Sequence, residues 1–543
     1  MDQSFNDLQQ TRAAFKPPVE LMGRIPLACT YLLLVGAALA PIFFVTVPTL
    51  VDYPNHLARI HILANLHEIP ALAENYTTEW TLIPNLGIDL LLPVIARAVG
   101  TYDAGRIFIS VVILSNIIGV LFLRRVLYGR LDSLPIFFFL FIYSHLFFWG
   151  FLNYFFGIGL YLIFFASWIV LRDDLRLWKV GLFSLLSVIL FFIHFMALGV
   201  YSLSILAYEA WRFVDRRDQP RRVRLAALAL LQFFPVGLLT VLWVGGVTGG
   251  GGGNGDLIYG DLKWKIFALF SPAVYSGRWF DLVTLVTAFG AILWMVGERP
   301  FSISKPLRWP LMVLCIAAIA MPHESRSIEV WGIDLRLPPV IMMLFIGAAR
   351  LKETHRARYR TAVYAACALV VLRAIDVALL WTGMDARFHE FRQAVQKIEP
   401  GASLLVVQDR EDLPDNLKPL GDRPFWHMAS LAIIERSVFT PLQFTGHMAL
   451  RATEKRHPID TPVGTPVSRE GLKEAETLNN NELARNYATT KYLRTYWGEW
   501  QKNFDYVLVV RFANTENPSP GYLKPIVNGS FFDIYGVIKP APT

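Results

Sequence analysis

The sequence contains few charged residues and very little cysteine for a chain of 543 residues. Charged side chains make up 17% of it, whereas a wholly soluble chain carries about 25%. This shortage excludes a protein that is soluble throughout, and it indicates a multi-span membrane protein with one soluble portion. The three cysteines lie inside apolar runs, so they predict neither a disulfide framework nor a thiolate metal site: Cys29, Cys315 and Cys367.

Several signatures of common chemistry are also missing. The glycine run Gly249–Gly253 lacks the GxxxxGK[ST] order of a phosphate loop and follows no predicted strand, so it indicates a flexible outer loop. His56, His61 and His67 are not spaced as an i, i+4 pair on one helix face, so they predict no zinc site. Residues 384–543 contain no nucleophile elbow, dinucleotide loop or zinc motif, and no chemistry is assigned to them.

Long apolar runs are abundant, with 54% hydrophobic residues and a mean hydropathy of +0.42. The net charge of +8 does not indicate nucleic-acid binding, because most Lys and Arg fall in short loops between the runs, as in cytoplasmic loops. A span needs about 20 apolar residues, and the pattern predicts about eleven spans with the N-terminus inside. The runs after the first are Gly105–Leu123, Leu134–Phe148, Leu152–Leu171, two spans within Val180–Ala210, Leu225–Val247, Phe280–Val296, Trp309–Met321, Pro339–Ala349 and Thr361–Trp381.

The run Val180–Ala210 is too long for one crossing, and His194 lies near its middle. Two spans that meet at His194 deliver the following arginines to the inside, as the charge rule requires. Eleven spans then place residues 384–543 outside the membrane. Their pattern predicts helices over 388–398 and 427–435 and strands over 403–407, 506–510 and 531–538, which together indicate a small extracytoplasmic α/β domain.

The first apolar run, Ile25–Val51, ends directly before the polar stretch Asp52–Arg59. We expect this run to be an uncleaved first span, after a cytoplasmic segment over 1–24. It leads into a long outer loop over 52–104, which belongs to a transmembrane domain over 25–383. Within the loop, residues 83–93 are apolar but interrupted by Pro and Asp, and they indicate an interfacial or re-entrant helix.

Ionisable residues gather on the outer side once the spans are assigned. Asp52 lies at the mouth of the first span, where a functional carboxylate is favoured over a helix cap because polar groups at that depth are costly. Carboxylates deprotonate hydroxyl groups, and arginines bind phosphate and stabilise its charge. The candidates are Asp52, His56, Arg59, Asp89, His194, His323, Glu324, Arg326, Asp334 and Arg336.

The chain order resembles the GT-C superfamily of integral-membrane glycosyltransferases. The resemblance rests on the acidic residue after the first span, the long first outer loop with an interfacial helix, the many spans and the extracytoplasmic α/β tail. It implies transfer of a sugar from a polyprenyl-phosphate or polyprenyl-diphosphate donor to a glycan, lipid or protein acceptor at the outer face of a bacterial inner membrane. It also implies a catalytic base at Asp52 and a donor-phosphate ligand at Arg336. From their residue types and position, Arg326, Arg59 and His194 are further candidates for binding the donor phosphate.

The sequence departs from two subfamilies of that superfamily. Asp52-Tyr53 replaces the adjacent Asp-Glu pair of the protein O-mannosyltransferases, and no Trp-Trp-Asp triplet like that of the oligosaccharyltransferases is present. A monophosphate leaving group needs no divalent ion, so we expect no metal and no other cofactor. His56, Asp89, His323 and Glu324 are the remaining candidates for the site.

Other interpretations stay open at this stage. Asp334 and Arg336 also suit interfacial anchors, His194 suits a turn between two spans, and Asp89 suits a residue that satisfies backbone groups beside prolines. A lipid or polysaccharide transporter is the main alternative function. Transporters commonly carry internal repeats and polar groups near the bilayer midplane, neither of which the sequence contains. A scaffold subunit of an envelope-polysaccharide complex is the third alternative.

Overall fold

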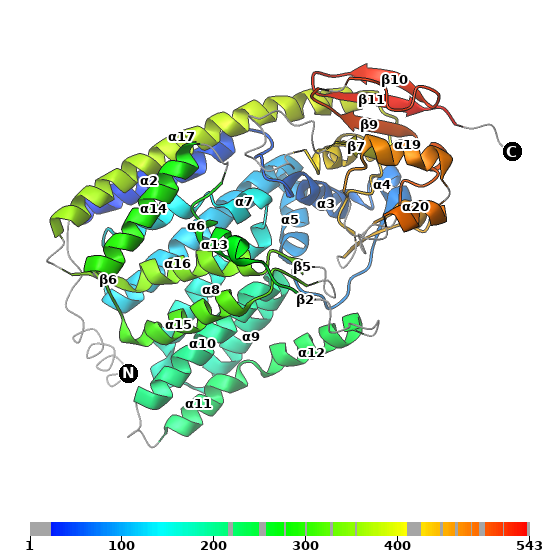
Figure 1. Ribbon diagram of the computed structural model, residues 1–543. Helices are drawn as coiled ribbons and strands as arrows, with labels where there is room; N and C mark the ends of the chain where they lie inside the picture. The colour runs from blue at the N-terminus through cyan, green and yellow to red at the C-terminus, as the bar shows by residue number, and fades with distance from the viewer. Residues whose placement is uncertain are drawn as a thin grey trace. The chain divides into compact units, whose positions relative to one another are not determined.

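The computed structural model describes residues 23–215, 221–248, 257–275, 279–298, 301–325, 330–352, 356–409, 425–445, 449–461, 465–478, 480–487, 495–513 and 515–539. The chain is mostly helical (Figure 1) and forms two compact units. We call the first the helical unit, which comprises Met1–Pro41 and Ile109–Val377. We call the second the mixed unit, which comprises Ile42–Phe108 and Ala378–Thr543.

The helical unit is a bundle joined by short turns and three short pairings of extended chain. Its helices are α2 (Arg24–Phe43), α6 (Thr101–Tyr128), η1 (Leu134–Phe141), α7 (His145–Trp149), α8 (Leu152–Leu171), η2 (Arg172–Asp174), α9 (Leu177–Ile193), α10 (Phe195–Asp215), α11 (Arg222–Leu231), α12 (Phe234–Thr248), α13 (Leu262–Phe270), α14 (Trp279–Glu298), α15 (Lys305–Ala320), η3 (Asp334–Arg336), α16 (Leu337–Ala348) and α17 (Arg356–Ala394). The boundaries between the units fall inside α2, α6 and α17. The strands are β2 (Leu257–Ile258), β3 (Phe301–Ile303), β4 (Glu324–Ser325), β5 (Val330–Trp331) and β6 (Ala349–Leu351).

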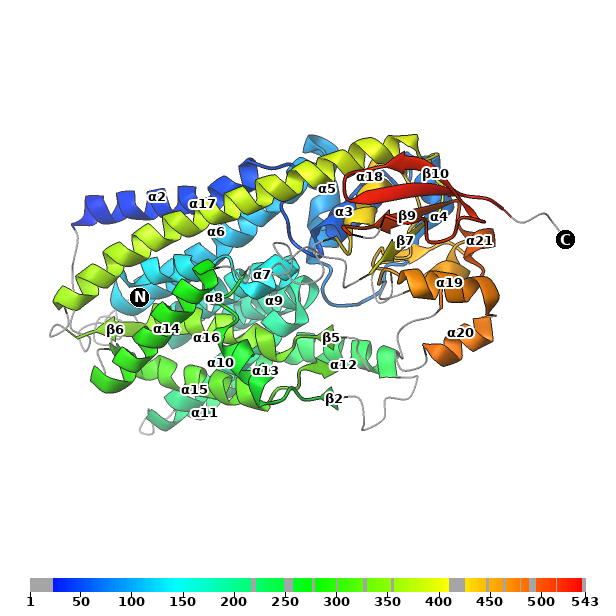
Figure 2. The ribbon, with the colours of Figure 1, turned by 45° about the horizontal axis from the view of Figure 1, so that its top comes forward.

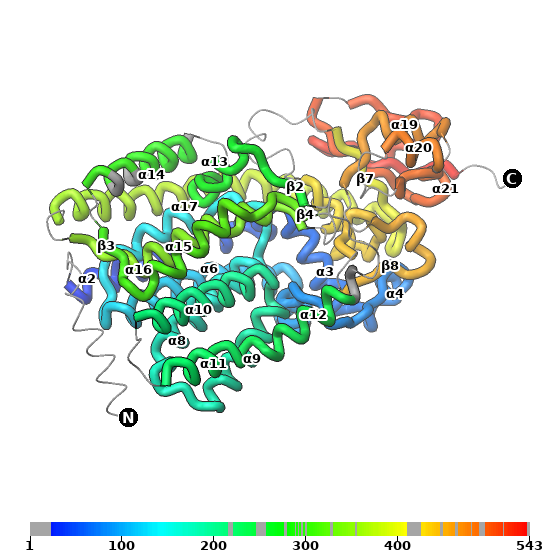
Figure 3. The backbone as a smooth tube through the Cα atoms, turned by 60° about the horizontal axis from the view of Figure 1, so that its bottom comes forward, coloured from blue at the N-terminus to red at the C-terminus, as the bar shows by residue number. Residues whose placement is uncertain are grey.

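Helix α10 packs against α8, α9 and α15, while α15 also packs against α16. Figure 3 shows α11 and α12 running beside α9. A buried ion pair joins the end of α8 to α10, with Arg172 Nη2 2.5 Å from Glu209 Oε2. Trp168 Nε1 donates to the same carboxylate at 2.9 Å, so the buried charge has both a counter-charge and a hydrogen bond.

Close contact between α6 and α8 depends on glycine. A Cβ atom added to Gly159 would lie 2.3 Å from Ser115 Oγ and 2.7 Å from the Ser115 carbonyl carbon. One added to Gly119 would lie 2.8 Å from Leu162 Cβ. Small residues at such crossings let two membrane helices approach closely. The contact between α6 and α8 therefore requires that Gly159 and Gly119 carry no side chain.

The predicted count of eleven spans is not confirmed. Among the described residues, the helices long and apolar enough to cross a membrane are Arg24–Phe43, Thr101–Tyr128, Leu152–Asp174 and Arg356–Lys397. The helices Arg222–Leu231 and Phe234–Gly245, which bend by 41° at their junction, add a fifth if they count as one span. Several predicted spans are shorter helices instead, because breaks interrupt the apolar runs. Leu134–Phe148 divides into η1 and α7, and α16 has 12 residues.

The predicted break at His194 is confirmed, since α9 ends at Ile193 and α10 begins at Phe195. The predicted helix over 83–93 begins later, as α5 (Gly87–Val99), and continues through Pro93. One face of α5 is buried and carries Asp89, whereas Leu90, Leu91 and Val94 are exposed. An exposed apolar face of this kind is typical of an interfacial helix, and its place at the membrane surface stays a prediction.

The mixed unit contains the predicted α/β fold. Its remaining elements are α3 (Tyr53–Asn65), α4 (Pro70–Asn75), β1 (Tyr76–Thr78), α5, η5 (Val395–Lys397), β7 (Leu404–Gln408), η8 (Met428–Ser430), α18 (Leu431–Arg436), β8 (Leu450–Ala452), η9 (His457–Ile459), α19 (Arg469–Thr477), α20 (Asn480–Asn486), α21 (Trp500–Asn503), β9 (Tyr506–Val510), β10 (Leu523–Asn528) and β11 (Phe532–Val537). Four of these strands form a sheet in the order β10-β11-β9-β7, in which β7 and β9 are parallel and the other pairs antiparallel (Figure 1). Figure 2 shows β10, β9 and β7 of this sheet in a second view.

The domain boundaries differ from the prediction. The sequence predicts that residues 52–104 belong with the transmembrane domain, whereas in the structure Ile42–Phe108 and Ala378–Thr543 form one compact unit. Strand β1 of the loop pairs with β8, with Tyr76 opposite Ala452, and α3 packs against η8 and α18. The apolar side chains of α3 and β1 find their partners there. The Tyr76 ring, for example, lies 5.7 Å from the ring of Phe439.

The contact between α6 and α8 gives a direct test of helix packing. We expect Gly159→Ala to destabilise the protein by about 1 to 3 kcal/mol, because the added methyl group overlaps Ser115. Gly181→Ala in α9 is the matched control, because nothing lies within 4 Å of its Cβ position. The control should keep or raise stability, since alanine favours a helix more than glycine does. Thermal unfolding in detergent measures both, and equal effects would contradict the packing described.

Candidate functional site

Asp52 stands at the N-cap position of α3, but its side chain makes no capping hydrogen bond. Proline follows in the first turn of the helix, so one of the amide donors that a cap would satisfy is absent. The carboxylate is 15% exposed, and its Oδ1 lies 3.5 Å from Nε2 of His427. The interpretation of Asp52 as a helix cap is therefore wrong in this structure, and its carboxylate is oriented toward an imidazole of the C-terminal segment.

The ring of Phe444 packs against both histidines of this region. The His427 ring lies 4.9 Å from it and the His56 ring 6.2 Å, each in an edge-to-face arrangement. His427 is 3% exposed, while His56 is partly buried. Asp52, His56 and His427 thus lie around the first turn of α3 within the mixed unit, and the carboxylate remains accessible at their edge.

Arg59 and Asp89 form a buried ion pair between α3 and α5. Arg59 Nε lies 2.6 Å from Asp89 Oδ1, and both side chains are at most 1% exposed. Burial raises the pKa of the Asp89 carboxyl group, and the charge of Arg59 offsets only part of this rise. Each charge has its counter-charge inside the protein, so loss of either partner would leave an uncompensated buried charge between α3 and α5. The predicted role of Arg59 toward a donor phosphate stays a prediction.

Arg336 is a partly buried cation in the helical unit that has no carboxylate partner within the described residues. Its Nη2 donates to the Trp331 carbonyl at 2.9 Å, its Cζ lies 4.9 Å from the centre of the Phe151 ring, and its Nε is buried without a partner. Burial lowers the pKa of the guanidinium to about 10, so the group is still charged at neutral pH. A charge with so few partners suits an anionic ligand.

His194 and Arg336 are brought together through Tyr154. The Tyr154 ring lies 5.4 Å from the His194 ring, edge to face, and its hydroxyl donates to the carbonyl oxygen of Arg336. His194 Nδ1 accepts the backbone N–H of Met196 at 3.2 Å, which fixes the ring at the junction of α9 and α10. This bond is what the interpretation of His194 as a turn residue predicts. The role of His194 in phosphate binding stays a prediction.

His323, Asp334 and Lys265 form a second polar cluster of the helical unit. Asp334 is completely buried, with His323 Nδ1 3.1 Å from its Oδ1 and Lys265 Nζ 2.9 Å from its Oδ2. Glu324 lies in β4 and pairs with Trp331 of β5 through the backbone. The Asp334 carboxylate thus pairs with Lys265 and His323 and not with Arg336. Arg326 and the glycine run lie outside the described residues.

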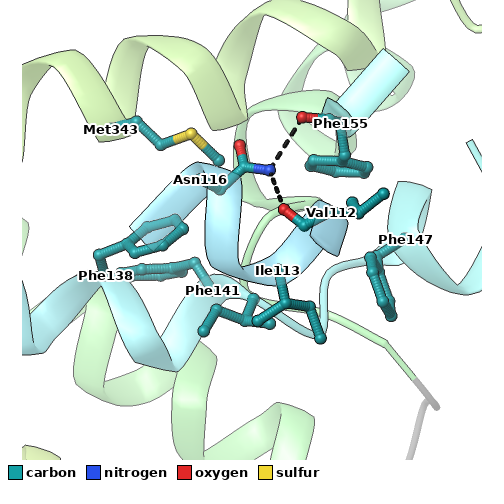
Figure 4. Close-up of a pocket in the computed structure, with 9 residues that line it drawn as sticks. Val112, Ile113, Asn116, Phe138, Phe141, Phe147, Phe155 and Met343 are labelled. Atoms are coloured by element: carbon teal, nitrogen blue, oxygen red, sulfur yellow. Dashed lines mark hydrogen bonds between the residues drawn. The ribbon is translucent and has the colours of Figure 1, made fainter. Parts of the chain in front are cut away.

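An apolar pocket lies inside the helical unit (Figure 4). Its lining consists of Val112, Ile113, Asn116, Phe138, Phe141, Ile142, Phe147, Phe155 and Met343. The Asn116 amide donates to the carbonyls of Val112 and Phe155, at 2.8 Å each, and its Oδ1 has no partner within the described residues. No charged side chain lines this pocket, so it provides no acid, base or phosphate ligand.

Sequence reasoning missed two residues that complete these clusters, His427 and Tyr154. His427 is separated from Asp52 by most of the chain, and nothing in its local sequence indicates a contact with α3. Tyr154 lies inside an apolar run, where the sequence suggests only an aromatic side chain packed in the core. Among the described residues, no group of three or more His, Cys, Asp or Glu side chains is placed to hold a metal ion.

No family model matches the sequence, and no curated protein matches it. Among solved structures, the chain is similar to the apo crystal structure of ArnT from Cupriavidus metallidurans, with 13% identity, 94% of this chain and 98% of that chain covered, and a TM-score of 0.46. The crystal structure of the same ArnT bound to undecaprenyl phosphate gives 12% identity, coverage of 93% and 97%, and a TM-score of 0.44. ArnT is a GT-C glycosyltransferase, the superfamily that the sequence resembles. At this identity and TM-score, the similarity assigns no activity, ligand or site residue to this chain.

Proposed function

We propose that this protein is a membrane glycosyltransferase that uses a polyprenyl-phosphate-linked sugar at the outer face of a bacterial inner membrane. The acceptor is an envelope glycan, lipid or protein. The observation that carries the proposal is the Asp52 carboxylate, which follows the first apolar helix, makes no capping bond and is 15% exposed. A carboxylate that makes no capping hydrogen bond and that solvent reaches is available as a general base.

In the proposed reaction, an acceptor hydroxyl oxygen attacks the anomeric carbon of the donor sugar. The new C–O bond forms as the bond from that carbon to the phosphate oxygen breaks, and the polyprenyl phosphate leaves with the electron pair. Asp52 takes the hydroxyl proton as the bond forms. A single displacement of this kind inverts the anomeric configuration.

The leaving phosphate gains negative charge as the bond breaks, and this charge needs a cation. Arg336 suits the role, because its guanidinium presents a buried N–H without a partner and faces no carboxylate within the described residues. An arginine can bind two oxygens of one phosphate through its planar fork, so it also orients the leaving group.

The first prediction for this function concerns Asp52→Asn, which keeps the size of the side chain and removes the base. We expect it to lower transfer by about 10²- to 10⁴-fold. Stability should change by about 0.5 kcal/mol or less, because no capping bond is lost. Ser468→Ala is the matched stability control: it removes the real cap of α19, whose Oγ accepts from Gly471 N, and should cost about 1 kcal/mol.

Mass-spectrometric profiles of envelope glycans and glycolipids test this prediction in cells with wild-type protein, no protein or Asp52→Asn at matched levels. Loss of the same sugar in the null and Asp52→Asn cells supports the transferase and its base together. Loss in the null cells alone would overturn the role of Asp52 and favour a transporter or a scaffold. An unchanged profile in all three would refute the proposed function.

The second prediction concerns Arg336→Met. We expect kcat/KM for the native donor to fall by about 10²-fold, because the leaving phosphate loses its cation. The fold should tolerate the change, since the substitution leaves no carboxylate unpaired. Arg308→Met in α15 is the matched control, because Arg308 is exposed and donates to the Ile303 carbonyl. Equal rates for the two variants in a transfer assay would contradict the role of Arg336.

A further inference from the structure

The orientation of the Asn55 side-chain amide is determined by a backbone donor. The N–H of Phe444 points at Asn55 Oδ1 from 3.1 Å, and Gln443 Nε2 lies 2.8 Å from the same atom. A backbone N–H can only donate, so the atom that receives it must be the amide oxygen. The other amide atom is therefore the NH₂ nitrogen, and Asn55 is completely buried in this orientation.

This orientation determines where the proton of His427 lies. Asn55 Nδ2 donates to the Leu442 carbonyl at 2.6 Å, and it lies 3.3 Å from His427 Nδ1. An NH₂ group offers no lone pair to an imidazole N–H, so Nδ1 must be the acceptor. A neutral histidine then carries its proton on Nε2, which is the atom 3.5 Å from Asp52 Oδ1.

We propose that His427 is a positioning residue for Asp52, because the buried Asn55–His427 pair directs an N–H at one carboxylate oxygen. This inference rests on the proposed function of Asp52. The Nε2–H lies beside Oδ1 at 3.5 Å and orients the carboxylate, and Oδ2 is left to receive the proton of the acceptor hydroxyl. His427 does not take that proton, since Nε2 already carries one and Nδ1 is engaged by Asn55.

The other ionisable groups on elements packed against α3 have their own partners. Asp89 of α5 pairs with Arg59, and Glu435 of α18 lies 2.6 Å from Arg392. Arg436 donates to the Ile398 carbonyl at 2.8 Å. In the first turn of α3, His56 packs against Phe444 and the Tyr53 hydroxyl is buried. His427 is the residue whose ring nitrogen lies 3.5 Å from the Asp52 carboxylate, so its replacement should alter the orientation of Asp52.

Substitutions of His427 can distinguish the effect of the N–H donor from the effect of the bulk of the ring. Gln places its NH₂ nitrogen where Nε2 of histidine lies, counted along the side chain, whereas Asn places its NH₂ nitrogen at the Nδ1 position. His427→Gln therefore keeps a donor toward Asp52, and His427→Asn and His427→Phe remove it. His389→Gln is the control, because His389 is an exposed histidine of the same unit.

The assay uses purified full-length protein added to solubilised membranes from cells that lack it, since these contain unused donor and unmodified acceptor. Initial rates of sugar transfer are measured by mass spectrometry over a range of acceptor concentrations. For His427→Asn and His427→Phe, we expect kcat to fall about tenfold with little change in KM, because the base is misoriented while the acceptor still binds. His427→Gln should restore most of kcat, and His389→Gln should match wild type.

Thermal unfolding of each variant shows whether it is folded, and only folded variants are compared. If wild type transfers sugar and Asp52→Asn does not, an unchanged kcat in His427→Asn would overturn the positioning role and leave the proposed function intact. A loss in His427→Gln as large as that in His427→Asn would also overturn it, because the ring and not its Nε2–H would then matter. Absence of transfer by wild type would instead refute the proposed function itself.

Discussion

The mixed unit depends on one buried side chain, Asn55 of α3. Its amide bonds to three consecutive residues of the C-terminal segment, Leu442, Gln443 and Phe444, and also to His427. A buried amide whose bonds were lost would cost about 1 to 3 kcal/mol for each unsatisfied group. The amide therefore fixes the register of α3 against a segment almost 400 residues away in the chain, and it sets the position of Asp52, three residues earlier.

This constraint explains why Asp52 is not a helix cap. A cap would turn the carboxylate back toward the amides of α3, but proline occupies the first turn and the carboxylate faces His427 instead. The ion pair between Arg59 and Asp89 also joins α3 to α5. The Asp52 carboxylate, 15% exposed, is thus held within the mixed unit with one oxygen facing His427. A general base needs such an orientation.

Much of the local structure could be predicted from the sequence. The break at His194 follows from the length of its apolar run, and the strands near residues 404, 506 and 532 follow from their runs of branched and aromatic residues. The number of spans could not be predicted. Apolar composition alone does not show where a run breaks into short helices, as between η1 and α7.

The union of the first outer loop with the tail was not predictable either. The pairing of β1 with β8 and the contacts of Asn55 join segments whose local sequences carry no sign of each other. The candidate base at Asp52 was found because it follows an apolar run, a local signal. His427 was missed because its contact with Asp52 is a product of the fold. Long-range contacts of this kind become visible only in three dimensions.

If the proposed function is right, a polyprenyl phosphate leaves each time a sugar is transferred. The ratio of polyprenyl phosphate released to sugar transferred can be measured with purified wild-type protein and with lipids and acceptor from cells that lack it. We expect one polyprenyl phosphate for each sugar transferred and no release when the acceptor is omitted. Release of a polyprenyl diphosphate, or transfer without any polyprenyl product, would contradict it.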